Sequence, residues 1–451
     1  MNATQFEFWN RTLGWSVFAI ALVTFGLTVE PTASFWDASE YIATSAKLQV
    51  GHPPGAPFYQ MMGAFFSLFA SGPEQIALLV NLMSVFSSAF TILFLFWTLT
   101  LLLKKLPAFS TLKTTNDALA FFGSAVIGAL AFCFSDSFWF NAVEAEVYAM
   151  ATCILSLLFW LSLRWEQEMN TPRGDRWLLL IAFVIGLSFG VHFMGLLTIP
   201  ALGMIYYFKN YKKTTVKGFI YANLIATAIL LFIFKLLLPL TLAFFGKAEV
   251  FFVNSIGLPF NSGTIFAALF FIFFFYYTLR LTYKKNWVNL NTGVLSVLFV
   301  LLGFSSWIMI PIRANANTVI NENSPSDARL LLAYYNLEQY PETKLFYGPM
   351  FSDIYAGQDP EEPFIDDKPK YERDYTTGRY KIVNFWEGAR YNSNSAHNGL
   401  LPRLWSSEHA GNYMNFTEPL EFSIKSSYRS NPQLQKRVKD FKEDIEEGAV
   451  N

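Results

Sequence analysis

Long apolar runs alternate with short polar stretches through the first 312 residues, and the alternation ends there. An apolar run of about 20 residues is long enough to cross the hydrocarbon core of a bilayer as a helix. Such runs predict spans near 13–29, 76–103, 118–135, 143–163, 218–240, 264–283 and 293–312. The stretch 177–208 is too long for one span and too short for two, so it predicts two short helices that meet near a membrane face. We therefore expect an all-α polytopic membrane protein with about nine membrane segments.

Charge divides the 451-residue chain at the same point. Residues 1–312 hold 30 charged side chains, whereas the remaining 139 residues hold 37, a density typical of a soluble domain. We expect a transmembrane domain at 1–312, with its first outer loop at 30–75, and a polar, mixed and loop-rich exported domain at 313–451. The net charge of −1 gives no indication of nucleic acid as a partner.

Basic residues lie mainly on one side of the predicted membrane. With a cytoplasmic N-terminus, the inner segments carry 14 Lys and Arg residues, and the outer loops between spans carry only Lys47 and Lys247. Because cytoplasmic loops are enriched in Lys and Arg, this bias predicts a cytoplasmic N-terminus and an exported tail. The first apolar run has no small-residue cleavage site, so we expect it to remain as an anchor in the inner membrane.

Four acidic residues on the predicted outer side adjoin apolar spans. Asp37 and Glu40 follow the first span, and on a short helix over Ala38–Val50 they share a face. Glu144 and Glu146 fall at the outer end of the fourth span. Carboxylates at a bilayer surface are costly to desolvate and often mark a working site. The alternative is an ordinary solvated loop.

The tail has weaker signals. Asn321–Asp327 reads as a turn, followed by a helix over Asp327–Gln339 with Ser326 or Asp327 at its cap. Residues 432–447 predict a charged helix, whereas Tyr347-Gly348-Pro349 and residues 353–381 are expected to be loop-rich. The stretch Tyr380–Ser407 is rich in aromatic, Asn and Arg residues, which suits sugar or peptide binding but is also ordinary in loop-rich domains. Both cysteines lie in predicted spans, so we expect no disulfide in the tail.

Several short motifs occur together in chain order. They are Trp36-Asp37 with Glu40, Gly51-His52-Pro53-Pro54-Gly55, Glu144-Ala145-Glu146-Val147-Tyr148, Gly190-Val191-His192, and Arg313-Ala314-Asn315-Ala316-Asn317 through Asn321-Glu322-Asn323. This set resembles the bacterial protein O-mannosyltransferase-like membrane family of the GT-C glycosyltransferase superfamily, long filed as a domain of unknown function. Any one of the motifs alone is weak, but the ordered set is specific.

The resemblance implies a GT-C-like helical bundle and an inverting transferase. Such enzymes move a sugar from a polyprenyl-phosphate carrier to an acceptor, here an exported protein's Ser or Thr, on the non-cytoplasmic face. It also implies that an acid of the first outer loop is the base, and by position that acid is Asp37, with Glu40 beside it. Larger members continue with further spans, so we expect this chain to be a fragment or a reduced member.

The chemistry assigns roles to the remaining candidates. A carboxylate near the acceptor takes its proton, and one such group is enough in an inverting displacement. We expect Asp37 to be that base, and Glu40, Glu144 or Glu146 to orient it, to bind the acceptor or to raise its pKa. The candidates for binding the donor phosphate are Arg313, His52, His192 and Lys235. Their alternative roles are interfacial anchoring or pairing with a tail carboxylate for Arg313, snorkelling for Lys235 and packing for His192.

No metal-binding signature such as CxxC, HExxH or Asp-x-Asp occurs, so we expect neither a metal nor a bound cofactor. Two other functions stay open. A transporter or flippase for a lipid-linked glycan needs charges along a midplane path, where Lys235 is the only charged residue well inside a span. A noncatalytic subunit for envelope assembly is compatible with the early C-terminus.

Overall fold

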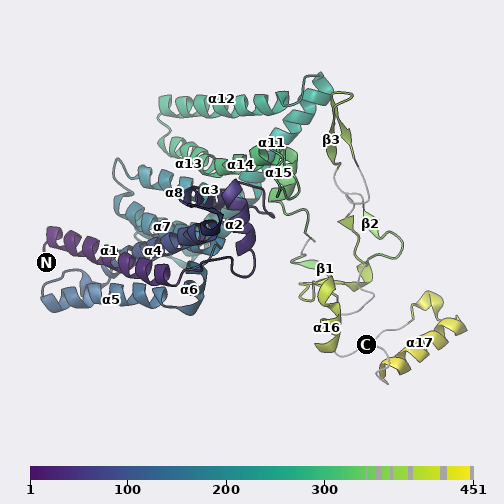
Figure 1. Ribbon diagram of the computed structural model, residues 1–451, viewed down its shortest axis with the longest axis horizontal. Coiled ribbons are helices and arrows are strands. Elements are labelled where there is room, and N and C mark those ends of the chain that lie inside the picture. Colours follow the sequence, from purple (N-terminus) through teal and green to yellow (C-terminus); the bar gives the residue numbers. More distant parts are fainter. Residues whose placement is uncertain (341–343, 352–357, 366–368, 384–389, 417–423, 447–451) are drawn as a thin grey trace. The chain divides into compact units, whose positions relative to one another are not determined.

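The structure, a computed structural model, describes residues 1–340, 344–351, 358–365, 369–383, 390–416 and 424–446 (Figure 1). The chain forms two compact units. The first contains residues 1–255 and 261–339, and the second contains residues 256–260 and 340–451. The first unit is helical and holds all the acidic candidates.

Within the described residues, seven helical stretches are long and apolar enough to cross a membrane, which confirms the seven predicted spans and a multi-pass membrane protein. These stretches contain α1 (Ala3–Leu27), α4 (Ile76–Leu103), α5 (Thr115–Cys133), α7 (Val147–Glu168), α10 (Val216–Leu231) with α11 (Leu238–Val250), α12 (Ser262–Lys284) and α13 (Val288–Phe304). One of them, Val216–Ile256, is 41 residues long and exceeds the predicted span at 218–240.

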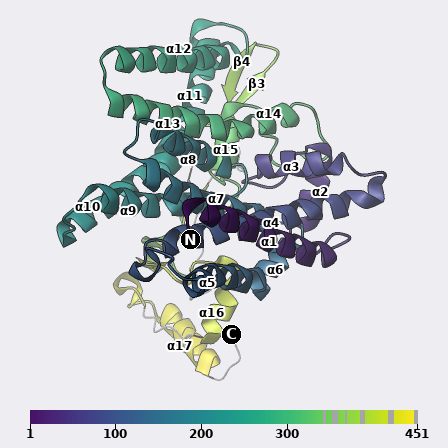
Figure 2. The same ribbon diagram turned by 90° about the vertical axis from the view of Figure 1, so that its left-hand side faces the viewer.

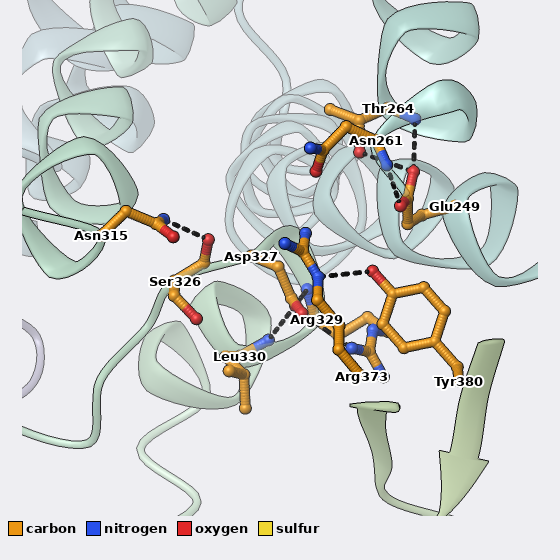
Figure 3. A network of polar contacts seen from close by, with 10 residues as sticks. All are labelled: Glu249, Asn261, Thr264, Asn315, Ser326, Asp327, Arg329, Leu330, Arg373 and Tyr380. Carbon is orange, nitrogen blue, oxygen red and sulfur yellow. Dashed lines mark hydrogen bonds and ion pairs between the residues drawn. The ribbon is translucent and has the colours of Figure 1, made fainter. Parts of the chain in front are cut away.

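The extended stretch includes a buried acidic residue, Glu249. It lies near the end of α11 and is 3% exposed, and its carboxylate accepts the backbone N–H groups of Asn261 (2.5 Å) and Thr264 (2.9 Å) at the start of α12 (Figure 3). A buried carboxylate is tolerated where backbone donors satisfy it. Glu249 therefore joins the end of α11 to the start of α12.

The stretch 177–208 forms two short helices, as predicted. α8 (Asp175–Ser188) and α9 (Thr198–Asn210) are joined through the 3₁₀ turn Phe193–Leu197. α9 runs beside α10 (Figure 2). The prediction that these two short helices bring the membrane segments to about nine stays a prediction.

α8 and α13 approach each other at backbone distance. A Cβ added to Gly186 of α8 would lie 2.0 Å from the carbonyl oxygen of Val300, and one added to Gly303 of α13 would lie 2.2 Å from that of Phe183. Small residues permit such close helix contacts in membranes. Just beyond α13, the indole of Trp307 donates a hydrogen bond to the carbonyl of Phe189 (3.0 Å). These contacts fix the chain immediately before His192.

The first unit also contains several shorter helices. They are α2 (Ala38–Lys47), α3 (Pro57–Ser67), α6 (Asp136–Ala142), α14 (Met309–Ala314) and α15 (Ala328–Tyr335). Asp327 caps α15 as predicted, accepting the N–H groups of Arg329 (2.8 Å) and Leu330 (3.1 Å) (Figure 3). α15 ends before the predicted Gln339 because Leu337 adopts a left-handed backbone conformation (φ 59°) that no helix continues.

The second unit contains short antiparallel strand pairs. β1 (Tyr347–Pro349) pairs with β6 (Asn398–Leu400), β2 (Phe364–Ile365) with β5 (Arg390–Tyr391), and β3 (Tyr371–Asp374) with β4 (Arg379–Ile382). The described part of this region is loop-rich, as predicted, and the short strands were not predicted because cross-strand pairing is not visible in such short segments. The helices are α16 (Ala410–Phe416) and α17 (Pro432–Glu446), and α17 confirms the predicted charged helix.

Within this unit, Tyr380 of β4 is buried, and its ring lies 5.1 Å from that of Phe260. Arg373 donates a hydrogen bond to the Tyr380 hydroxyl (3.1 Å) (Figure 3). Its guanidinium also lies over the Phe260 ring. One end of the aromatic-rich stretch Tyr380–Ser407 thus serves packing. Residues 384–389 of that stretch lie outside the described residues.

Candidate active site

Four of the predicted site residues come together in the first unit. Asp37 is the N-cap residue of α2, and Glu40 lies in its first turn. His52 follows in the loop to α3, and Glu146 is the N-cap residue of α7. The shared face expected for Asp37 and Glu40 is confirmed, because both carboxylates face His52.

Glu40 and His52 are joined by two hydrogen bonds. Glu40 Oε2 lies 2.8 Å from His52 Nδ1, and Oε1 accepts the backbone N–H of His52 (2.7 Å). The bond to Glu40 raises the pKa of His52 and lowers the pKa of Glu40. Burial opposes both shifts but is the smaller effect. The pair therefore favours an imidazolium beside an ionised carboxylate.

Asp37 is the open member of the cluster. Its Oδ2 lies 3.8 Å from His52 Nε2, and 57% of its side chain is exposed. The preceding Trp36 has a left-handed backbone conformation (φ 61°), which is rare for a bulky residue and often found at functional sites. The side chains of Phe35 and Trp36 are more than four-fifths exposed. Asp37 thus stands at the edge of the cluster, reachable from outside.

Glu146 is the buried member. It is 6% exposed, and burial together with the charges of Asp37 and Glu144 raises its pKa to about 7. The backbone N–H groups of Asp37 and Val147 face its carboxylate and oppose that rise. Glu144 is 3% exposed, and burial also raises its pKa. Near neutral pH, Glu146 is poised between its protonated and ionised forms.

The remaining candidates lie in other surroundings. Arg313 donates from Nε to the carbonyl of Leu48 (2.5 Å) and from Nη2 to that of Lys47 (3.1 Å), at the C-terminal end of α2. Lys235 is exposed on a π-helical turn, with its ammonium 4.7 Å from the centre of the Phe234 ring. No contact described for Lys235 joins it to the cluster, and its binding of phosphate stays a prediction.

His192 lies beside Tyr148, with 5.5 Å between the ring centroids. Its Nδ1 accepts the backbone N–H of Met194 (3.1 Å), so a neutral ring carries its proton on Nε2. Burial lowers the pKa of His192, which favours this neutral form. His192 is therefore suited to donate one hydrogen bond rather than to carry a positive charge.

Two supporting residues are absent from the sequence prediction. Asn81 of α4 is 1% exposed, and its Nδ2 donates to the carbonyls of Glu30 (2.6 Å) and Thr32 (2.8 Å), which fixes the loop that leads to Asp37. A polar residue inside an apolar span was an available signal. Tyr334 of α15 donates to the carbonyl of Gly51, beside His52, and no pattern in the sequence indicates this.

No group of three or more His, Cys, Asp and Glu side chains within the described ranges is arranged to hold a metal ion. The acidic and imidazole groups instead support acid–base chemistry around Asp37. Reaction without a metal or cofactor stays a prediction.

Two parts of the chain are similar to known protein families. Residues 37–215 match the family described as the protein O-mannosyl-transferase TMEM260 N-terminal domain, and residues 341–441 match a family of unknown function (DUF8416). The chain is 27% identical over 174 residues to protein O-mannosyl-transferase TMEM260 of Mus musculus, covering 38% of this chain and 22% of that protein. It is 23% identical over 162 residues to the Dictyostelium discoideum protein of the same name, covering 36% and 18%.

The chain thus spans about a fifth of the length of these curated relatives. No solved structure matches it significantly. The matched region begins at Asp37 and contains Glu40, His52, Glu144, Glu146 and His192.

Proposed function

Because residues 37–215 match an O-mannosyltransferase-like family, we propose that the chain is a membrane glycosyltransferase with an exported protein as acceptor. The sugar donor is a polyprenyl-phosphate-linked sugar, and the acceptor group is a Ser or Thr hydroxyl. The reaction takes place on the non-cytoplasmic face of the inner membrane, in a GT-C-like bundle whose N-terminus is cytoplasmic and whose C-terminal domain is exported.

This proposal depends on how exposed each acidic side chain is. Asp37 exposes over half of its side chain, Glu40 is bound to His52, and Glu146 is buried. An acceptor hydroxyl can therefore reach the Asp37 carboxylate directly. A base must lie within hydrogen-bond reach of the proton that it takes.

The reaction follows from this placement. Asp37 takes the hydroxyl proton while the acceptor oxygen bonds to the anomeric carbon of the sugar. The bond from that carbon to the lipid phosphate breaks on the opposite face, which inverts the configuration. His52, held as a cation by Glu40, places positive charge beside the Asp37 carboxylate. Glu146 holds the start of α2 through the Asp37 N–H.

A transfer assay tests the proposal. The purified chain in liposomes receives a panel of polyprenyl-phosphate-linked sugars, mannose among them, together with Ser/Thr-containing peptides, and mass spectrometry detects glycosylated peptide. Asp37→Asn should reduce transfer at least about a hundredfold. Asp136→Asn, at an exposed acid of α6, is the matched control and should retain full activity.

The other outcomes separate the alternatives. Movement of the lipid-linked sugar across the bilayer without transfer identifies a flippase, and neither movement nor transfer identifies a noncatalytic subunit. Full activity of Asp37→Asn would reassign the base to another acid of the cluster.

A further inference from the structure

The segment that follows the last span lies along the loop that carries His52. Val50 donates its N–H to the carbonyl of Ile320 (3.1 Å), and Glu322 donates its N–H to the carbonyl of Val50 (3.0 Å). These bonds form a parallel bridge between Val50 and Asn321. Beside the bridge, the side-chain oxygen of Gln49 accepts the N–H of Ile320 (2.9 Å). Residues 49 and 50 are thus tied to a part of the chain about 270 positions away.

Tyr334 extends this attachment to both sides of His52. Its hydroxyl donates to the carbonyl of Gly51 (2.6 Å), the residue before the histidine. The same hydroxyl lies against Gly55, where an added Cβ would be 2.3 Å away. Gly55 has φ 78°, a conformation that favours glycine. Tyr334 is 2% exposed, so its ring cannot move away without opening the surrounding core.

Gly51 also determines how closely Glu40 approaches. A Cβ added to Gly51 would lie 2.7 Å from Glu40 Oε1, the oxygen that accepts the His52 N–H. A displacement of Gly51 therefore moves the backbone donor that Glu40 binds. The chain of contacts runs from the Tyr334 hydroxyl to Gly51, then to His52 and Glu40.

We propose that Tyr334 is a positioning residue, whose hydroxyl fixes the Gly51–Gly55 loop so that the His52 ring stays between Glu40 and Asp37. Tyr334 lies outside the region 37–215 that matches the O-mannosyltransferase-like family, so the match assigns it no role. The catalytic consequence rests on the proposed function, whereas the placement of His52 does not. Misplacement of a reacting group by about 1 Å is enough to lower a rate a hundredfold.

The neighbouring tyrosine provides a matched control. Tyr335 lies on the same helix and is also buried, at 6% exposure, but its hydroxyl donates to the carbonyl of Phe234 (3.1 Å), away from the loop. Tyr334→Phe and Tyr335→Phe each remove one buried hydroxyl that binds a backbone carbonyl. A purely structural role predicts similar effects for the two variants, and a positioning role predicts different ones.

The first readout is the titration of His52 in the full-length protein labelled on its histidines. The charged groups that face His52 are Glu40, Asp37 and Glu146. In Tyr334→Phe the contact with Glu40 should loosen, so the His52 pKa should fall by about half a unit or more toward its ordinary value. In Tyr335→Phe it should be unchanged. His52→Gln identifies the signal among the four histidines.

The second readout is transfer kinetics. Tyr334→Phe should lower kcat about tenfold and leave the KM for the lipid-linked donor unchanged, whereas Tyr335→Phe should retain the wild-type kcat. A second variant guards against loss of folding. Gly55→Ala keeps the tyrosine but displaces its hydroxyl, and it should reproduce the fall in the His52 pKa. Melting temperatures verify that each variant is folded.

Two results are decisive against the proposal. One is an unchanged His52 titration in both Tyr334→Phe and Gly55→Ala, and the other is an equal shift in Tyr334→Phe and Tyr335→Phe. If the wild-type protein shows no transfer at all, the proposed function fails, and the titration still decides whether Tyr334 positions His52.

Discussion

Glu40 binds His52 at two points at once, with one carboxylate oxygen on the imidazole Nδ1 and the other on the backbone N–H. The side chain thereby fixes both the charge of the ring and the path of the loop. Asp37 lies on the opposite side of the ring, near Nε2. The imidazole thus lies between one engaged carboxylate and one open carboxylate, and most of the expected behaviour of the site follows from this order.

Glu40→Gln should lower the pKa of His52. The bond to Glu40 is the main cause of the raised value, and burial, which lowers it, remains in the variant. Histidine NMR measures the change. His192 serves as the internal control, because burial alone lowers its pKa and Glu40 does not contribute. An unchanged His52 titration would show that the pair does not form.

The same pair should stabilise the fold within a limited pH window. The contribution of Glu40, whose pKa is lowered, is present above its ordinary value of 4.5 and is lost as pH falls through the lowered pKa. The contribution of His52, whose pKa is raised, is present below its ordinary value of 6.5 and is lost as pH rises through the raised pKa. The difference in melting temperature between wild type and Glu40→Gln should therefore be largest between these two values.

Relative to wild type, Glu146→Gln should gain stability as pH rises. A carboxyl group whose pKa rises from 4.5 to about 7 stabilises the fold below pH 4.5, and this contribution is lost as pH rises through 7. The gain at pH 8 is on the order of 3 kcal/mol, since one pKa unit corresponds to about 1.4 kcal/mol. Melting temperatures at pH 5 and pH 8 test this.

Glu249→Gln is the matched control for that experiment. Glu249 is equally buried, and the backbone N–H groups of Asn261 and Thr264 bind both of its carboxylate oxygens. The amide replaces one acceptor oxygen with a donor, so this variant should be destabilised at both pH values. A gain of stability in Glu249→Gln, or an equal gain at both pH values in Glu146→Gln, would contradict the electrostatic explanation.

Arg313→Ala should destabilise the protein without raising the KM for the lipid-linked donor. The guanidinium binds the last carbonyls of α2, where a cation also interacts favourably with the helix dipole. Loss of these bonds should cost about 2 kcal/mol. Donor titrations and thermal unfolding separate the two roles. A raised donor KM at wild-type stability would instead support the phosphate-binding role predicted from the sequence.

Gly51→Ala should impair transfer although the substitution is small. The new methyl group would lie 2.7 Å from Glu40 Oε1 and would force the carboxylate away from His52. We expect at least about a tenfold loss of kcat. Gly293→Ala in α13 is the control, because no atom lies within 4 Å of its added Cβ. Equal activity of the two variants would show that the close approach at Gly51 has no catalytic importance.

The sequence predicted what depends on local periodicity. Apolar runs located the spans, and the spacing of Asp37 and Glu40 in a short helix predicted their shared face. Capping chemistry predicted Ser326 or Asp327 at the start of α15, and Asp327 is the cap. Each of these follows from neighbouring residues alone, so no knowledge of the tertiary fold was needed.

Such local patterns could not predict contacts between distant segments. Arg313 was predicted as a candidate for binding the donor phosphate, but its carbonyl partners could not be predicted, because they become available only where α2 ends beside it. The raised pKa of Glu146 requires burial that spacing does not reveal. Tyr334 acts on a loop 283 residues earlier in the chain, and only the folded bundle brings the two together.

The contact between Gly186 of α8 and Gly303 of α13 determines how closely these two helices pack. Gly186 and Gly303 leave no space for even a methyl group, so any larger residue there forces the two helices apart. α13 leads into Trp307, which holds the carbonyl of Phe189 three residues before His192. A larger residue at either glycine would therefore displace the backbone that precedes His192. Loss of activity can thus result from a substitution in the apolar interior, where no polar group is present.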